Sequence, residues 1–139
     1  MTVTVGRREH FNAAHRLARP DWSEEQNKAV FGPCANANFH GHNYVLDVRL
    51  TGPIDPETGY VIDLKHLSGI VKREVLDRYD HRNLNLDCEE FRTLNPTAEH
   101  IARVIWQRLR AVLPPQLKLH VTLHETDRNF VEYTGPEVL

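Results

Sequence analysis

The chain has little cysteine, no long apolar run and almost no excess of either charge. Each of these absences excludes a class of protein. With two cysteines among 139 residues, it lacks the disulfide framework of a small secreted protein, so we expect a cytoplasmic location. No segment approaches the roughly 20 apolar residues that a transmembrane helix needs, so we expect no membrane partner. Seventeen basic and nineteen acidic residues give a net charge of −2, and no lysine or arginine run predicts nucleic-acid binding.

Histidine, in contrast, is abundant, with nine in the chain. His40 and His42 lie two residues apart at the start of an alternating segment, and such residues share one face of a strand. The parity continues through Tyr44 and Leu46, so this face is expected to be buried, where an unpaired imidazole costs free energy. His15 falls in phase with the apolar residues of an earlier strand. Three histidine ligands with a vacant fourth coordination position are typical of catalytic zinc sites. The alternative is that the three histidines are unrelated, with two making hydrogen bonds and one solvated.

Cys34 lies in the polar loop before this strand, and three roles are open for it. It is a small buried apolar residue, a fourth zinc ligand that closes a structural site, or a catalytic thiol. The spacing alone does not separate ligand from base. Cys88 stands in an acidic stretch, where negative neighbours keep a thiol protonated, so we interpret it as inert.

Glu125 and the pair Asp80-His81 are further candidates. Glu125 continues the buried parity of a late alternating segment, and a carboxylate there accepts two adjacent N–H donors of a ligand. The alternative is a solvated carboxylate at the strand end, or one paired with Arg128. Asp80-His81 follows a predicted helix end, and by itself this dipeptide is a weak signal for acid–base chemistry.

The pattern of alternation and helix capping predicts one α+β domain over residues 1–139. Asp63 and Thr97 are good N-caps for two amphipathic helices. The predicted order is strand, strand, helix, helix, strand, strand, which favours an antiparallel four-stranded sheet with both helices on one face. Its exposed edges favour an oligomer. The predicted strands are 2–13, 42–51, 117–123 and 130–133, with a short one at 60–62; the helices are 64–78 and the segment between Thr97 and Pro114; the long loops are 19–39 and 80–96.

Several short motifs then follow one another along almost the whole chain. Together they closely resemble the 6-pyruvoyl-tetrahydropterin synthase family and its relatives, the 6-carboxytetrahydropterin synthases. The motifs are Phe11-Asn12-Ala13-Ala14-His15-Arg16, Cys34 with His40-Gly41-His42-Asn43-Tyr44, Gly52-Pro53-Ile54-Asp55-Pro56-Glu57-Thr58-Gly59, Asp80-His81-Arg82-Asn83-Leu84-Asn85, Pro96-Thr97-Ala98-Glu99 and Glu125-Thr126.

The resemblance implies a T-fold subunit of the ββααββ type. Its trimers would form a continuous barrel, and two trimers would stack into a homohexamer. It also implies a bound Zn²⁺ ion with His15, His40 and His42 as ligands. Cys34 would then be the thiol that abstracts a proton, and Asp80 and His81 of a neighbouring subunit would complete its relay.

The substrate implied by the resemblance is 7,8-dihydroneopterin triphosphate. Glu125 would anchor the pterin ring, Thr97 would line that pocket, and Arg16 would contact the phosphates. Zinc would act as a Lewis acid on the side-chain hydroxyls, making the adjacent C–H protons removable. Internal redox rearrangement and loss of triphosphate would give 6-pyruvoyl-tetrahydropterin.

The two branches of the family differ in their product. The 6-carboxytetrahydropterin synthases, which serve queuosine biosynthesis, also release acetaldehyde from the same substrate. The five-residue gap between Cys34 and His40 and the long loop before it favour the pyruvoyl branch, which serves tetrahydrobiopterin biosynthesis. A non-catalytic zinc-binding or pterin-binding T-fold module is the remaining alternative.

Overall fold

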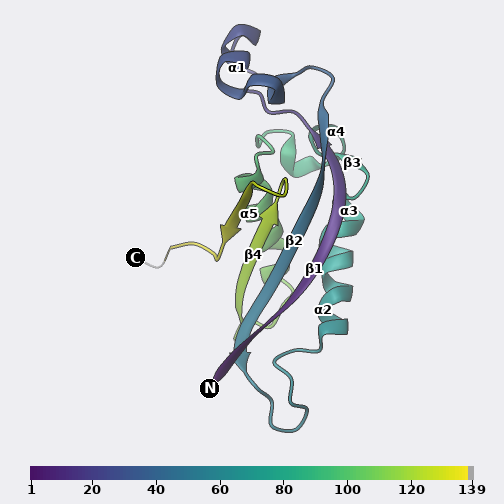
Figure 1. The fold of residues 1–139 in the computed structure, drawn as a ribbon, viewed down its shortest axis with the longest axis vertical. Coiled ribbons are helices and arrows are strands. Elements are labelled where there is room, and N and C mark those ends of the chain that lie inside the picture. The colour runs from purple at the N-terminus through teal and green to yellow at the C-terminus, as the bar shows by residue number, and fades with distance from the viewer. Residues whose placement is uncertain (138–139) are drawn as a thin grey trace.

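The computed structural model describes residues 1–137, which form one five-stranded sheet with helices against one of its faces (Figure 1). The strand order is β3-β1-β2-β4-β5, and every pairing is antiparallel except that of β3 with β1. The strands are β1 (Thr2–His15), β2 (His40–Pro53), β3 (Arg82–Asn83), β4 (Lys118–His124) and β5 (Phe130–Tyr133). The helices are α1 (Glu24–Phe31), α2 (Leu64–Val71), α3 (Asp77–Tyr79), α4 (Leu84–Asp87) and α5 (Ala98–Arg110).

The long strands β1 and β2 pair over 14 residues each, from Thr2 opposite Pro53 to His15 opposite His40. Side chains alternate between the two faces of each strand, and the inward set packs beneath α2 and α5. This alternation confirms the predicted α+β class, with an antiparallel sheet and helices on one face. In Figure 1, β1 ends and β2 begins at the top, beside the loop that carries α1.

Both predicted helix caps are confirmed. The Asp63 carboxylate accepts from the backbone N–H of Lys65, and the Thr97 hydroxyl accepts from that of His100. The helix predicted at 64–78 is formed by α2, one π-helical turn (Lys72–Leu76) and α3 in succession. No helix among residues 1–137 is both long and apolar enough to cross a membrane.

The structure corrects three local predictions. The segment 19–39 is not a plain loop, because it contains α1 and a 3₁₀ turn, Gly32–Ala35. Residues 60–62 form no strand. The segment 80–96 contains the two-residue β3, so the sheet has five strands where four were predicted. The two polar segments, 19–39 and 80–96, depend on capping and tertiary pairing rather than on an apolar period. Residues 60–62 are apolar but find no partner strand among the described residues.

Phe11 provides a test of how the core supports this end of the sheet. Its ring is buried, stacks on Tyr44 at 4.9 Å between centroids and lies 6.2 Å from the Tyr79 ring. We expect Phe11→Ala to lower the free energy of unfolding by about 3–5 kcal/mol, because the lost contacts leave a cavity. Urea unfolding measures this loss. The exposed Val3 has the same parity on β1, and Val3→Ala should change stability by only about 0.5 kcal/mol; equal losses would contradict the assigned packing.

Candidate metal centre

Three histidines meet where β1 ends and β2 begins. His15 and His40 are direct partners across the two strands, and His42 pairs with Ala13, one step along the same face. The ring centroids lie 4.5 Å apart for His15 and His40, 5.1 Å for His15 and His42, and 4.9 Å for His40 and His42. One nitrogen from each ring lies within 4.8 Å of the other two, so the three imidazoles are placed to share one metal ion.

The free ring nitrogens at this site fit a metal. Nε2 of His15, both nitrogens of His40 and Nε2 of His42 are buried and have no hydrogen-bond partner among the described residues. Burial lowers the pKa of His15 to about 4; the hydrogen bond to Pro96 opposes this shift, and the neighbouring rings add to it. Burial, and then His42, lowers the pKa of His40. The rings of His15 and His40 therefore favour the neutral form, which is the form that binds a metal.

The orientation of the His15 ring is fixed by a hydrogen bond at one of its two nitrogens. Its Nδ1 lies 2.8 Å from the carbonyl oxygen of Pro96, and because a carbonyl only accepts, Nδ1 carries the proton and Nε2 is the free ligand atom. The Tyr44 hydroxyl lies 3.4 Å from the same Nδ1. Burial raises the pKa of Tyr44 far above its usual value, so this hydroxyl stays protonated. Pro96 and Tyr44 thus support His15 without contacting the metal position.

Glu125 reaches the same site from the end of β4. Its Oε1 lies 3.9 Å from Nε2 of His42, and its side chain is 21% exposed. The turn after it is closed by hydrogen bonds from the Glu125 backbone N–H to the Asn129 carbonyl and from the Asn129 N–H to the Thr126 hydroxyl. Among residues 1–137 the Glu125 carboxylate accepts no hydrogen bond, so both oxygens are free for a ligand next to the histidines.

Cys34 lies beside the site but outside the ligand set. The histidine cluster whose ligand atoms lie within 4.8 Å does not include Cys34 in the described part of the chain. The thiol is half-buried and unpaired, and the Cys34 carbonyl accepts from the backbone N–H of Leu17, which ties its 3₁₀ turn to the chain just after β1. Cys34 and Glu125 are both close enough to raise the pKa of Tyr44, after burial. The geometry therefore favours a free thiol near an open metal site over a fourth ligand.

Asp80 and His81 form a pair at the outer edge of β1. Nδ1 of His81 lies 3.0 Å from Oδ2 of Asp80, and Oδ1 of Asp80 accepts from the Asn12 backbone N–H at 2.9 Å. That backbone hydrogen bond, more than His81, lowers the pKa of Asp80. His81 adopts a left-handed backbone with φ of 61°, and its side chain is 77% exposed. No hydrogen bond joins this pair to Cys34 within residues 1–137, so a single chain does not assemble the three groups.

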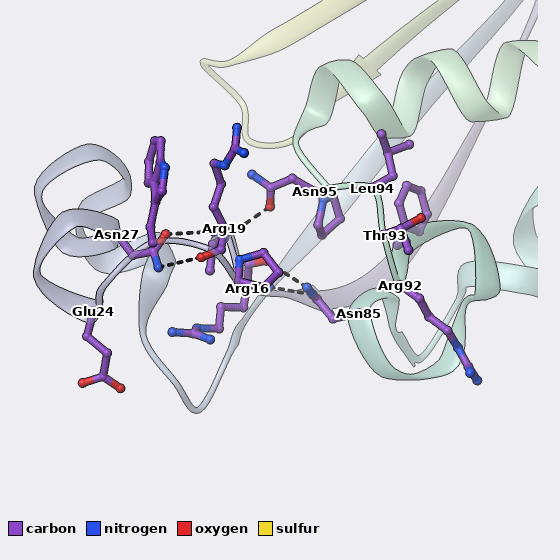
Figure 2. Close-up of a pocket in the computed structure, with 14 residues that line it drawn as sticks. Arg16, Arg19, Glu24, Asn27, Asn85, Arg92, Thr93, Leu94 and Asn95 are labelled. Carbon is purple, nitrogen blue, oxygen red and sulfur yellow. Dashed lines mark hydrogen bonds between the residues drawn. The ribbon is translucent and has the colours of Figure 1, made fainter.

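Arg16 and Thr97 lie next to the histidines but are engaged in the fold. Nε of Arg16 donates to the Ala35 carbonyl at 2.8 Å, and the Thr97 hydroxyl caps α5. Arg16 lines a cavity of about 320 Å³ with Arg19 and Arg92 (Figure 2). The three guanidinium groups point away from one another in this view, so they do not form one convergent phosphate site in the isolated chain.

The sequence did not predict the two groups that contact Nδ1 of His15, the Tyr44 hydroxyl and the Pro96 carbonyl. Tyr44 could have been found, because it continues the parity of His40 and His42 on one face. The Pro96 carbonyl carries no such signal, since 81 residues separate it from His15. Its role becomes visible only when the segment before α5 is folded against β1.

Comparison with known proteins identifies the family. A family model described as 6-pyruvoyl tetrahydropterin synthase matches residues 4–136. The chain belongs to this family. The human protein named 6-pyruvoyl tetrahydrobiopterin synthase is 41% identical over 131 residues, which are 94% of this chain and 90% of the human protein. The structure of the Caenorhabditis elegans 6-pyruvoyl tetrahydropterin synthase matches with a TM-score of 0.92 at 42% identity, covering 98% of this chain and 97% of that one.

These matches confirm the resemblance and the T-fold class predicted from the sequence. A relative named for a different activity is also similar to this chain. The Pyrococcus furiosus protein named dihydroneopterin monophosphate aldolase is 36% identical over 119 residues, which are 86% of this chain and 85% of that protein. Proteins similar to this chain therefore carry names for more than one reaction on pterins.

Replacement of His40 tests whether the three rings share an ion. We expect His40→Ala to weaken Zn²⁺ or Co²⁺ binding by more than about 100-fold, the upper end of what loss of a supporting hydrogen bond alone produces. Competition with a chromophoric chelator measures the affinity. His10 is exposed on the opposite parity of β1, so His10→Ala should bind metal like the original chain. Unchanged metal affinity in His40→Ala would show that His40 is not a ligand and that the three rings do not share one ion.

Proposed function

We propose that this chain is a zinc-dependent lyase that converts 7,8-dihydroneopterin triphosphate to 6-pyruvoyl-tetrahydropterin with release of triphosphate. The observation that carries the proposal is the set of buried ring nitrogens of His15, His40 and His42 in a member of this family. One nitrogen of each ring lies within 4.8 Å of the others, and these nitrogens have no hydrogen-bond partner within residues 1–137. The chain acts as one cytoplasmic domain, and its enzyme class is a carbon–oxygen lyase acting on phosphates. Neither a membrane nor a nucleic acid is a partner.

Zinc suits the donor set. Three neutral imidazoles leave a fourth position for a water or substrate oxygen, as catalytic zinc sites do. When bound, the ion supplies Lewis acidity that makes the C–H protons next to coordinated hydroxyls removable. Cys34 lies near this open position without belonging to the ligand set, which supports a role as base rather than ligand.

The remaining roles are those that the family resemblance implies, and the unpaired Glu125 carboxylate supports one of them. Glu125 holds the pterin through two adjacent N–H groups, because its carboxylate is unpaired and faces the His42 side of the site. Thr97 lines this pocket at the start of α5, and Arg16 contacts the phosphates. Cys34 takes a proton from the substrate side chain. His81, oriented by Asp80, moves protons at near-neutral pH.

Asp80 and His81 serve the site of a neighbouring copy. Their side chains are exposed at the β1 edge and have no hydrogen bond to Cys34 of their own chain within residues 1–137. The edge of β1 from Thr2 to Asn12 has no partner strand on its outer side among the described residues, and such edges favour assembly. The functional unit is therefore a homo-oligomer, a trimer or a hexamer.

The resemblance to the carboxy branch and one named relative keep carbon–carbon cleavage as the second candidate. The 6-carboxytetrahydropterin synthases, of the queuosine pathway, act on the same substrate and release acetaldehyde as well as triphosphate. The Pyrococcus furiosus relative is named an aldolase. Cys34 as base would serve either outcome, because both begin with removal of a proton from the substrate side chain.

Product analysis tests the proposed reaction. Incubation of the zinc-loaded protein with 7,8-dihydroneopterin triphosphate should give 6-pyruvoyl-tetrahydropterin and triphosphate by mass spectrometry, with no aldehyde. Acetaldehyde with a carboxypterin would assign the chain to the carboxy branch. Substrate binding that depends on Glu125 but yields no product would leave a binding module and refute the lyase.

The variant Cys34→Ala separates a base from a ligand. We expect it to retain one zinc ion and the melting temperature of the original chain, while turnover falls at least about 100-fold, because general-base catalysis contributes that much. Metal content, melting and turnover are measured on the same sample. Cys88 is buried away from the histidines, so Cys88→Ala should keep turnover. Loss of zinc together with stability in Cys34→Ala would indicate a closed structural site instead.

A further inference from the structure

We propose that Asn85 and Asn95 are positioning residues for the metal centre. Their side-chain amides fasten the backbone just after His15 to the segment that supplies the Pro96 carbonyl. This inference rests on the proposed function in one respect, namely that His15 is a metal ligand. It adds two residues that lie outside the ligand set and outside the implied catalytic groups.

The Asn85 side chain bonds the backbone that follows β1, just beyond the point where the pairing of β1 with β3 ends. The ladder between β1 and β3 covers only Ala13 and Ala14. Beyond it, the Arg16 backbone N–H donates to Oδ1 of Asn85 at 2.8 Å, and Nδ2 of Asn85 donates to the Arg16 carbonyl at 3.0 Å. One side chain thus makes the pair of hydrogen bonds that a neighbouring strand residue would make. Because the bonded residue directly follows His15, this amide fixes the backbone that carries the ligand.

Asn95 fixes the other partner of the His15 ring. Its Oδ1 accepts from the Ala18 backbone N–H at 3.2 Å. Its own carbonyl accepts from the Thr97 N–H at 2.8 Å and from Nδ1 of His100 at 2.7 Å. The next carbonyl along the chain is that of Pro96, which accepts from His15. Its position is therefore set by Asn95 on one side and by the capped start of α5 on the other.

Figure 2 shows both amides hydrogen-bonded to the backbone that follows β1. Together with the bond between the Pro96 carbonyl and the His15 ring, they link the chain on both sides of this contact. Asn85 bonds one residue after the ligand and Asn95 bonds three residues after it, and both belong to the segment between α3 and α5. If either bond is lost, the Pro96 carbonyl and the His15 ring are free to move apart. Loss of such a supporting contact at a metal-binding histidine lowers metal affinity by about 10–100-fold.

Asn27 offers a matched control in the same chain. Its amide makes the same pair of hydrogen bonds with the backbone of Arg19, at 2.8 Å and 3.1 Å, and it is only 5% exposed. These bonds close the loop that carries α1, and they lie four residues after His15. Asn27 therefore has the structural role of a backbone clamp without a connection to Pro96.

The test compares Asn85→Ala, Asn95→Ala and Asn27→Ala with the original chain. Each metal-free protein is titrated with Zn²⁺ against a chromophoric chelator, and its melting temperature is measured without metal. We expect Zn²⁺ affinity to fall about 10–100-fold in the first two variants, whereas Asn27→Ala should lose melting temperature but keep its affinity. The Co²⁺ absorption spectrum should change only in the first two, because it reports ligand geometry.

Asn85→Asp keeps the inference falsifiable if Asn85→Ala does not fold. This variant retains the acceptor for the Arg16 N–H and loses the donor, so its affinity should lie between those of the original chain and Asn95→Ala. Zn²⁺ affinities that stay within a factor of about three of the original chain's in both Asn85→Asp and Asn95→Ala would overturn the positioning role. A loss of Zn²⁺ affinity in Asn27→Ala as large as in those two variants would also overturn it. If the original chain itself bound no Zn²⁺, the proposed function would fail, which is a separate and distinguishable result.

Discussion

The register of β1 against β2 is the constraint on which the candidate site depends. Pairing from Thr2 to His15 puts Phe11 opposite Tyr44, Ala13 opposite His42 and His15 opposite His40. A slip of one residue would move every side chain of one strand to the other face. The stacked aromatic rings of Phe11 and Tyr44 hold this register at the end of the sheet that bears the histidines. The packing of the aromatic rings and the convergence of the three histidines are therefore two results of one alignment.

The second requirement is a set of polar contacts that begins where the ladder ends. At the histidines, β3 contributes only two residues, and side-chain amides, capped helix starts and carbonyl groups replace regular pairing. Buried imidazoles need such partners, because an unpaired polar group in a buried position costs free energy. Pro96 suits this place, since it has no N–H to satisfy and presents a carbonyl to His15. The site is thus held by hydrogen bonds on the side of Pro96, whereas the side chains of Cys34 and Glu125 have no such bonds to it in the part of the chain that the structure describes.

The long strands, the two capped helices and the three histidines were predictable from the sequence, because each follows from a local period or a capping residue. His15 was found through its phase with Phe11 rather than through proximity in the chain. The helix α1 was missed because only Asn27 is buried in it, so it has no apolar stripe, although Ser23 and the following acidic residues form a cap. Asn85 and Asn95 bond residues 69 and 77 positions away, and no local pattern encodes such contacts.

The distance between the histidines and the opposite end of the sheet has a practical consequence. The 14 residues of β2 span about 45 Å, and the connection from β2 to α2 lies at the far end from the metal centre (Figure 1). This connection is exposed at Asp55, Glu57 and Tyr60. A fluorophore or an affinity handle attached there would stand clear of the chemistry. The far connection is thus a suitable point for immobilising the protein.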